Sequence, residues 1–240
     1  MVGIARVSTV PTNIDTNIRG GTFTMLMRVK DYNGQPDDPQ VVFELFFSYG
    51  TQDFQDSGVN PVPKFDGNDT WTVDPSGVVG SNPSKYVSRY FDSHAYVAGG
   101  VLVAQFETAP VRLGPLVVNF LGGQFTAHLV PSGSSFRMEQ GVMQGRVRAA
   151  DLLTSFDVLF DRTSDSGVCG DRSSIYALLR PVVCNGVDLA FDPQRDNAGV
   201  QCDALGVTAR FSASPARLGD PLGAPPRVRL CGDSWEASCP

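Results

Sequence analysis

The sequence has few of the side chains that usually carry catalysis. It contains two histidines, His94 and His128, and no G-x-S-x-G motif. A catalytic triad or a histidine-rich metal site would need one of them beside a nucleophile or beside further ligands. His128 lies in the alternating run FTAHLV, which is typical of a strand. We therefore predict that the protein is not an enzyme, and a glycosidase-like site with paired carboxylates is the enzymatic alternative.

Lysine is also scarce, and no apolar run is long. The 240 residues include three lysines, and the formal net charge is -6. Nucleic-acid binding needs a clustered basic surface that releases counterions from the phosphate backbone, so we predict no nucleic-acid partner. The longest apolar candidates, such as AYVAGGVLVAQF, have the length of a strand and fall short of the ~18 apolar residues of a membrane helix. We predict no transmembrane segment.

Cysteine is missing from the first 168 residues, and the five cysteines all lie in the final third of the chain. An odd number is most simply two disulfides and one free or intermolecular thiol, which allows fifteen arrangements. A zinc site would need closer pairs than any present here. Disulfides persist in oxidising compartments, so we predict an extracellular or outer-membrane surface location. The cysteines are Cys169, Cys184, Cys202, Cys231 and Cys239.

The first residues, MVGIARVSTVP, have no basic stretch followed by an apolar one. An export signal usually has both. We therefore expect an exported chain whose signal is absent from this sequence.

Turn-forming residues and alternating patterns favour strands over long helices. The chain has 25 glycines and 17 prolines. From residue 21, Phe23, Met25, Met27 and Val29 alternate with polar residues, and the apolar run QVVFELFFSYG follows a turn, so a hairpin is expected. Further strands follow in AYVAGGVLVAQF and in residues 115–147. We predict a mainly β fold, an antiparallel β-sandwich with a jelly-roll or laminin-G-like arrangement as variants and with one or two short helices.

Two segments of the final third have helical periodicity. In RAADLLTSFDVLFD, apolar residues recur every three or four positions from Ala149 to Phe160. In SSIYALLRPVV, Ser173 is a candidate N-cap and Pro181 should kink or end the helix. We expect residues 1–240 to form a single β-rich domain, with residues 148–240 as a helix-containing, cysteine-rich part packed on the sandwich. The predicted buried residues of the second helix are Ile175, Leu178, Leu179 and Val182.

Glu44 is unusual because it lies in an apolar strand. A carboxylate there needs a partner, and we predict an arginine on an adjacent strand.

The long segment of residues 51–92 contains the main candidate for a ligand site. In FDGNDTWTVD, the aromatic Trp71 stands beside polar side chains. A ring that stacks on a sugar, with polar groups that bind its hydroxyls, is typical of carbohydrate contact. The alternative is that tryptophan fills the core and that Asp and Asn form turns. The predicted ligand-binding residues are Trp71, Asp66, Asn68 and Asp69.

Residues 184–202 form a candidate metal loop with a cysteine at each end. Calcium needs six to eight oxygen ligands, and this loop could supply about half of them. It lacks the spacing of an EF-hand. The alternative is that the acids orient turns while a disulfide restrains the loop. The predicted ligands are Asp188, Asp192, Asp196 and Asn197. Apart from calcium, no cofactor is expected.

One resemblance covers about residues 95–231. The stretches LVVNFLGGQFTAHLVPSGSSFRMEQGVMQGRVRAADLLTSF, SIYALLRPVVCNGVDL and CDALGVTARFSASPARLG resemble a group of uncharacterised secreted or surface lipoproteins of myxobacteria-like deltaproteobacteria. The resemblance implies a surface setting, with a lipidated cysteine ahead of Met1, and no known activity. Gly206 stands where that group often has serine, and Cys239 is extra, so no disulfide pairing is transferred.

We predict a non-catalytic secreted or cell-surface binding or structural module that contacts carbohydrate or protein. The first alternative is a self-assembling surface protein, in which exposed apolar strand edges pair to form a homo-oligomer. The second is the glycosidase-like enzyme.

Overall fold

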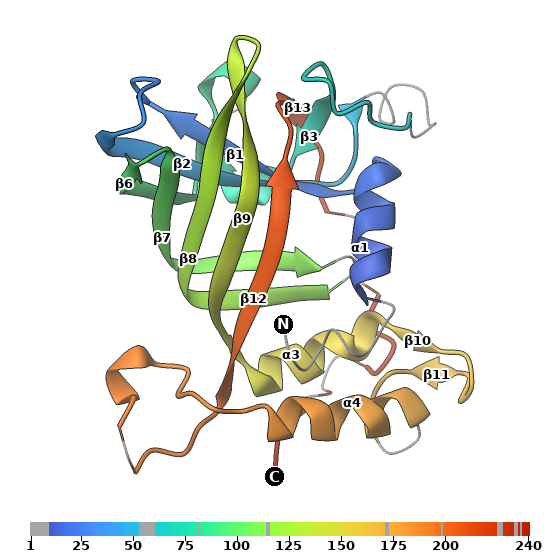
Figure 1. The fold of residues 1–240 in the computed structure, drawn as a ribbon. Coiled ribbons are helices and arrows are strands. Elements are labelled where there is room, and N and C mark those ends of the chain that lie inside the picture. The colour runs from blue at the N-terminus through green and yellow to red at the C-terminus, as the bar shows by residue number, and fades with distance from the viewer. Residues whose placement is uncertain are drawn as a thin grey trace.

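A single seven-stranded antiparallel sheet dominates the molecule (Figure 1). The computed structural model describes residues 10–52, 61–80, 82–113, 116–170, 173–197, 199–224, 228–232, 235 and 237–240. The strands are connected in chain order, which differs from the Greek-key order of a jelly roll. In sheet order they are β1 (Thr24–Lys30), β2 (Asp38–Ser48), β6 (Tyr90–Ala98), β7 (Val101–Leu113), β8 (Leu116–Ser132), β9 (Ser135–Arg148) and β12 (Ala204–Ala213).

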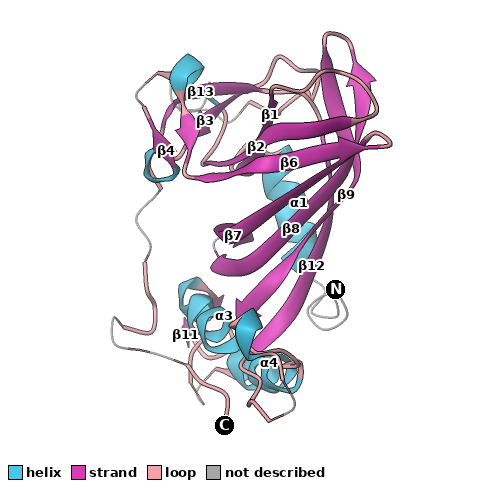
Figure 2. Cartoon of the chain, turned by 90° about the vertical axis from the view of Figure 1, so that its left-hand side faces the viewer, coloured by secondary structure: helices cyan, strands magenta, loops and turns pink. Residues whose placement is uncertain are grey.

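The sheet folds over so that its two halves pack against each other. Strands β2 and β8 are three strand spacings apart, which would be about 14 Å in a flat sheet. The rings of Phe43 on β2 and Phe125 on β8 nevertheless lie 4.5 Å apart between centroids. Figure 2 shows the group β1, β2 and β6 crossing the steeper group β7, β8, β9 and β12. The predicted mainly β, antiparallel fold is confirmed, and the folded sheet forms a sandwich or half-barrel.

The segment before β6, together with β13 from near the C-terminus, builds a second, smaller layer over the outer face of β1 and β2. Strand β3 (Thr70–Val73) pairs in parallel with β13 (Arg217–Pro221), and β4 (Val78–Val79) pairs with β5 (Val87–Ser88). Two short 3-10 helices, η2 (Pro75–Gly77) and η3 (Pro83–Lys85), connect them. This layer encloses a separate core of Leu26, Phe46, Trp71, Val73, Val78 and Tyr86.

The helices α3 (Ala149–Ser155) and α4 (Ser174–Asn185) lie together at one end of the sheet (Figure 1). The 3-10 helix η4 (Phe156–Val158) and the small hairpin of β10 (Phe160–Asp161) and β11 (Ser166–Gly167) lie between them in the sequence. A third helix, α1 (Val10–Arg19), was not predicted. The main core contains side chains from both the sheet and this helical layer, including Leu153 and Val183.

The second predicted helix is confirmed at its start and differs at its end. The Ser173 hydroxyl accepts a hydrogen bond from the Tyr176 backbone N–H at 3.1 Å, as expected of an N-cap. Pro181 does not end the helix, which continues to Asn185. The buried face consists of Tyr176, Leu179 and Val183. The predicted burial of Ile175 and Leu178 was wrong, since the helix turns these side chains to solvent and Leu178 is 64% exposed, while Val182 is half-buried.

The cysteines form two disulfides and leave one exposed thiol, as predicted from their number. The pairs are Cys169–Cys231 and Cys184–Cys239, and Cys202 is free. The alternative of a disulfide across residues 184–202 is not observed, because the C-terminal tail lies against α4 and places Cys239 beside Cys184.

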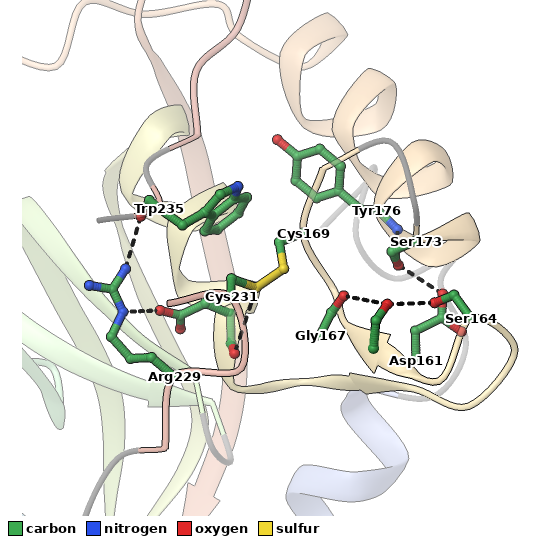
Figure 3. Close-up of a disulfide and its surroundings, with 11 residues drawn as sticks. Asp161, Ser164, Gly167, Cys169, Ser173, Tyr176, Arg229, Cys231 and Trp235 are labelled. Atoms are coloured by element: carbon green, nitrogen blue, oxygen red, sulfur yellow. Dashed lines mark hydrogen bonds and ion pairs between the residues drawn. A yellow bond between two sulfur atoms is a disulfide. The ribbon is translucent and has the colours of Figure 1, made fainter. Parts of the chain in front are cut away.

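Several contacts hold the tail on the helical layer besides the disulfides (Figure 3). Arg229 forms an ion pair with the buried Asp157 and donates a hydrogen bond to the Trp235 carbonyl at 2.9 Å. The ring of Trp235 meets that of Tyr176 edge-on at 5.6 Å between centroids. The tail therefore contacts η4 through Asp157 and α4 through Tyr176, and it joins these two parts of the helical layer.

Candidate functional site

The predicted sugar-stacking ring, Trp71, is buried. It is 2% exposed, and it belongs to the small core between the second layer and the sheet. Leu218 on β13 is its partner in the parallel pair. An indole enclosed in this way offers no face to a sugar, so the prediction of an exposed Trp71 was wrong and the core-filling alternative is observed.

The polar side chains near Trp71 form hydrogen bonds that stabilise the turn before β3. The Asp69 carboxylate accepts hydrogen bonds from the backbone N–H groups of Lys64 and Phe65. Asp66 accepts from the Asn68 N–H at 2.9 Å, and this bond lowers the pKa of Asp66 below its ordinary value. Asn68 accepts from Arg217 at 2.9 Å. The structure thus places Asp66, Asn68 and Asp69 close together, in the manner of an Asx-rich turn.

Three of the predicted calcium ligands, Asp188, Asp192 and Asp196, lie near an arginine. Arg146 on β9 forms an ion pair with Asp196 at 2.5 Å. The hydrogen bond to Asp196 raises the pKa of the Arg146 guanidinium, partial burial opposes this, and the charges of Asp188 and Asp192 add to the rise. The same hydrogen bond lowers the pKa of Asp196. The Arg146 guanidinium therefore supplies positive charge beside the candidate calcium ligands.

The other acids of this loop accept hydrogen bonds from backbone N–H groups. Asp192 caps the 3-10 helix η5 (Pro193–Arg195) by accepting from the Gln194 N–H at 2.9 Å. Asp188 accepts from the Gly206 N–H at 3.4 Å, and Asn197 is exposed. Within the described ranges, no three His, Cys, Asp or Glu side chains are grouped as metal ligands.

Calcium should leave the melting temperature of the oxidised protein unchanged, because Arg146 already pairs with Asp196 and offsets part of the charge of Asp188 and Asp192. The measurement is thermal unfolding in EDTA and then in millimolar calcium. A site filled at a hundred times its Kd would add about 2.7 kcal/mol. In the Arg146→Gln variant the carboxylates lose their shared cation, so calcium should raise its melting temperature more than that of the wild type. A clear rise in the wild type would contradict the role given to Arg146.

A buried carboxylate that the sequence analysis missed holds the start of α4 (Figure 3). Asp161 accepts a hydrogen bond from the Ser173 hydroxyl at 2.8 Å, and from the N–H groups of Thr163 at 2.9 Å and Ile175 at 3.3 Å. Burial alone would raise the pKa of Asp161, but these hydrogen bonds outweigh it and hold the pKa well below the ordinary range. The chain gave no signal for this site, because Asp161 and Ser173 meet only after the β10–β11 hairpin forms.

The stability that Asp161 provides should disappear in acid. A carboxyl whose pKa is depressed in the folded state stabilises the fold above the unfolded pKa of about 3.9, and this is lost as the pH falls towards the folded pKa. The difference in free energy of unfolding between wild type and Asp161→Asn should therefore be constant above about pH 4 and should shrink below it. Denaturant titrations over this range measure it. Asp165→Asn, at an exposed carboxyl of the same turn, is the control, and a pH-independent difference for Asp161→Asn would refute the assignment.

The predicted arginine partner of Glu44 is confirmed. Glu44 is 0% exposed, and Arg28, directly opposite on β1, forms an ion pair with it at 2.7 Å. Lys30 lies at 3.6 Å, and the Ser88 N–H donates to the other carboxylate oxygen at 3.1 Å. This buried carboxylate is enclosed by cations and by a backbone donor, an arrangement that anchors the second layer to the sheet.

A shallow groove on the outer face of the sheet is a further candidate, and the sequence analysis did not find it. Three glutamines form a row across neighbouring strands, because Gln105 on β7 pairs with Gln124 on β8, which pairs with Gln144 on β9. The groove has a volume of about 510 Å³ and is lined by Gln105, Phe106, Glu107, Gly122, Gly123, Gln124 and Gln144. A smaller hollow of about 110 Å³ shares Gln124 and Gln144 and continues to Thr126 and Val142.

Glycines create this groove. The register of β8 against β9 shifts between Leu121 and Gln124, so β8 has a bulge at Gly122 and Gly123. Gly122 has φ +60°, a conformation that favours glycine. Gly123 also lines the groove without a side chain, and on the core side of the sheet a Cβ on Gly145 would lie 2.7 Å from the ring of Phe120. The sheet therefore lacks side chains at this point, and the floor of the groove is partly backbone.

The groove has polar walls with free hydrogen-bonding capacity. The Gln144 amide donates to the Gln124 carbonyl oxygen at 2.5 Å. Within the described part of the chain, no hydrogen bond or ion pair occupies the side chains of Gln105 and Glu107. Glu107 is the single carboxylate among the lining residues. The site can thus offer both donors and acceptors to a polar ligand, and it holds no second carboxylate for paired acid and base catalysis.

Comparison with known proteins provides no relative for this chain, since no family model, curated protein or solved structure matches it. Among the described residues, no helix has the length and apolar character needed to cross a membrane.

Proposed function

We propose that the protein is a non-catalytic binding module of the cell exterior that contacts carbohydrate through the groove at Gln105, Gln124 and Gln144. The observation that carries this proposal is the open polar groove with unpaired amide and carboxylate groups. Sites for small apolar ligands are enclosed and mainly apolar, whereas an open surface of amides suits a ligand covered with hydroxyl groups. The proposal moves the site from the buried Trp71 to the outer face of the sheet.

The exterior location rests on the two disulfides, which are stable in oxidising compartments. The resemblance to surface lipoproteins implies the same setting and remains an expectation. The non-catalytic role is supported by the single carboxylate of the groove.

The test is binding of the oxidised full chain to immobilised polysaccharides, together with an assay for released reducing ends. We expect retention on at least one polysaccharide without release of reducing sugar. Release of reducing ends would favour the glycosidase alternative, and the absence of retention on every polysaccharide would refute carbohydrate binding.

Strand β12 supports a second candidate, self-assembly. Within the described sheet β12 is an edge strand, because β9 is the one strand that pairs with it and a single bridge to Leu189 covers its other side at Ala204. Its ten residues contain one charged side chain, Arg210, and no proline. Native proteins usually protect long edges with charges or prolines, so this edge suits pairing with a second copy. Light scattering measures the oligomeric state of the wild type and of Thr208→Pro. A dimeric wild type that Thr208→Pro converts to a monomer would support self-assembly, and a monomeric wild type would exclude it.

A further inference from the structure

The outer face beside the glutamine row carries an aromatic and aliphatic platform. Tyr96 on β6 pairs directly with Val103 on β7, and Val103 pairs with Thr126 on β8, which pairs with Val142 on β9. The neighbours of these residues along each strand, such as Ala95, Val97, Leu102 and Ala104, belong to the main core. Because side chains alternate along a strand, Tyr96, Val103, Thr126 and Val142 all face outward.

This platform and the glutamine row form one continuous surface. Val103 and Gln105 are two residues apart on β7 and therefore share a face, as do Thr126 and Gln124 on β8. Tyr96 is 43% exposed, and it is the diagonal neighbour of Gln105 across the strand pair. From Gly122 to Thr126 the surface extends for about 13 Å along β8.

The groove end of this surface carries a carboxylate and no lining cation. Glu107 lies at the end near Gly122, and neither the groove nor the hollow beside it is lined by lysine or arginine. The formal charge of the chain is -6. At the groove end an anionic polymer would meet the unpaired Glu107 carboxylate without a lining cation, whereas Arg210 on β12 stands opposite Val142 at the other end. A like-charge contact such as that with Glu107 is an effective element of selectivity.

We propose that the ligand of this face is a neutral polysaccharide segment lying along β8, with sugar C–H faces on Tyr96 and Val142 and with hydroxyl groups on Gln105, Gln144 and Glu107. This inference rests on the proposed function and adds the ligand class. Sugar rings combine an apolar face with a rim of hydroxyls, and the two zones of this surface match that division. Glu107 accepts hydrogen bonds from hydroxyls and disfavours uronates.

The experiment compares soluble dextran, mannan and laminarin with alginate, which is a uronate polymer, by affinity electrophoresis and calorimetry on the oxidised full chain. We expect at least one neutral polymer to bind at least tenfold more tightly than alginate. The variants Gln105→Ala/Gln144→Ala and Tyr96→Ala should each lower neutral binding about tenfold, because each removes contacts of ordinary hydrogen-bond or stacking strength. Gln194→Ala, an exposed glutamine on η5, is the matched control and should bind as the wild type does.

Glu107→Gln separates charge from hydrogen bonding. This variant should leave neutral binding within about twofold, since the amide still accepts hydrogen bonds, and it should strengthen alginate binding. If alginate binds the wild type as tightly as the neutral polymers, the inference fails while carbohydrate binding stands. If neutral binding survives in Gln105→Ala/Gln144→Ala and in Tyr96→Ala, the ligand lies elsewhere on the chain and the inference is overturned. If no polymer binds, the proposed function itself fails.

Discussion

Replacing Phe125 with alanine should lower the free energy of unfolding by about 3–5 kcal/mol, the range for a buried aromatic that is truncated in a core. The ring is enclosed between those of Phe43, at 4.5 Å, and Phe211, at 4.8 Å between centroids. These three rings come from β2, β8 and β12, so they join the two halves of the folded sheet. The loss includes the transfer of the ring to water and the cavity that remains.

Equilibrium denaturation in urea measures this loss. The matched control is Phe91→Ala, because Phe91 is a phenylalanine of the same sheet that is 51% exposed, and its replacement should change stability by about 0.5 kcal/mol or less. A loss below about 1 kcal/mol for Phe125→Ala would mean that the halves of the sheet do not pack across this ring, since a typical point substitution alone reaches that value.

The features that the sequence predicted correctly depend on local periodicity. The alternation around Met25 and Met27 predicted strand β1, and the turn that follows predicted the β1–β2 hairpin. In that hairpin Arg28 stands opposite Glu44, so an acid in an apolar strand could be matched to an arginine on its neighbour. The N-cap at Ser173 could also be predicted, because it depends on residues within one turn of the helix.

The errors concern contacts between residues far apart in the chain. Trp71 is covered through β13, which begins at Arg217, and nothing near Trp71 in the sequence indicates that pairing. The acids of the candidate calcium loop meet Arg146, which precedes them by more than forty residues. The residues next to Trp71 and those of the candidate calcium loop are polar, but their local sequence does not indicate which distant side chains they will contact.

The glutamine groove was missed for a different reason. Gln105, Gln124 and Gln144 lie on three different strands, and Gln124 stands opposite Gln144 only after the register of β8 against β9 shifts between Thr126 and His128. A second shift produces the bulge at Gly122 and Gly123. Without the bulge, Phe120 and Phe125 would point to opposite faces, since they are an odd number of residues apart. Both are buried in the main core, so the bulge serves the core and, in the same step, opens the groove.

Removing the disulfide between Cys184 and Cys239 by the double substitution Cys184→Ala/Cys239→Ala should lower the free energy of unfolding by about 4 kcal/mol. The two cysteines are 55 residues apart, and the unfolded chain gains the conformational entropy of the opened loop. The loss should be concentrated in the helical layer, because the tail contacts it at Ala237, whose N–H donates to Thr154 at 3.1 Å, and at Ser238, whose carbonyl accepts from Arg180.

Denaturant unfolding gives the total loss, and amide hydrogen exchange locates it. Exchange should accelerate in α4 and in residues 228–232 and 237–240, while β7, β8 and β9 keep their protection, since regions with fewer core contacts open first. The control is Cys202→Ser, which removes the exposed thiol without touching either disulfide and should leave stability within about 0.5 kcal/mol. Faster exchange in β8 and β9 of the disulfide variant would show that the tail also supports the sheet. If their protection is retained, carbohydrate binding by the groove should survive the loss of this disulfide, because every residue that lines the groove lies on β7, β8 or β9.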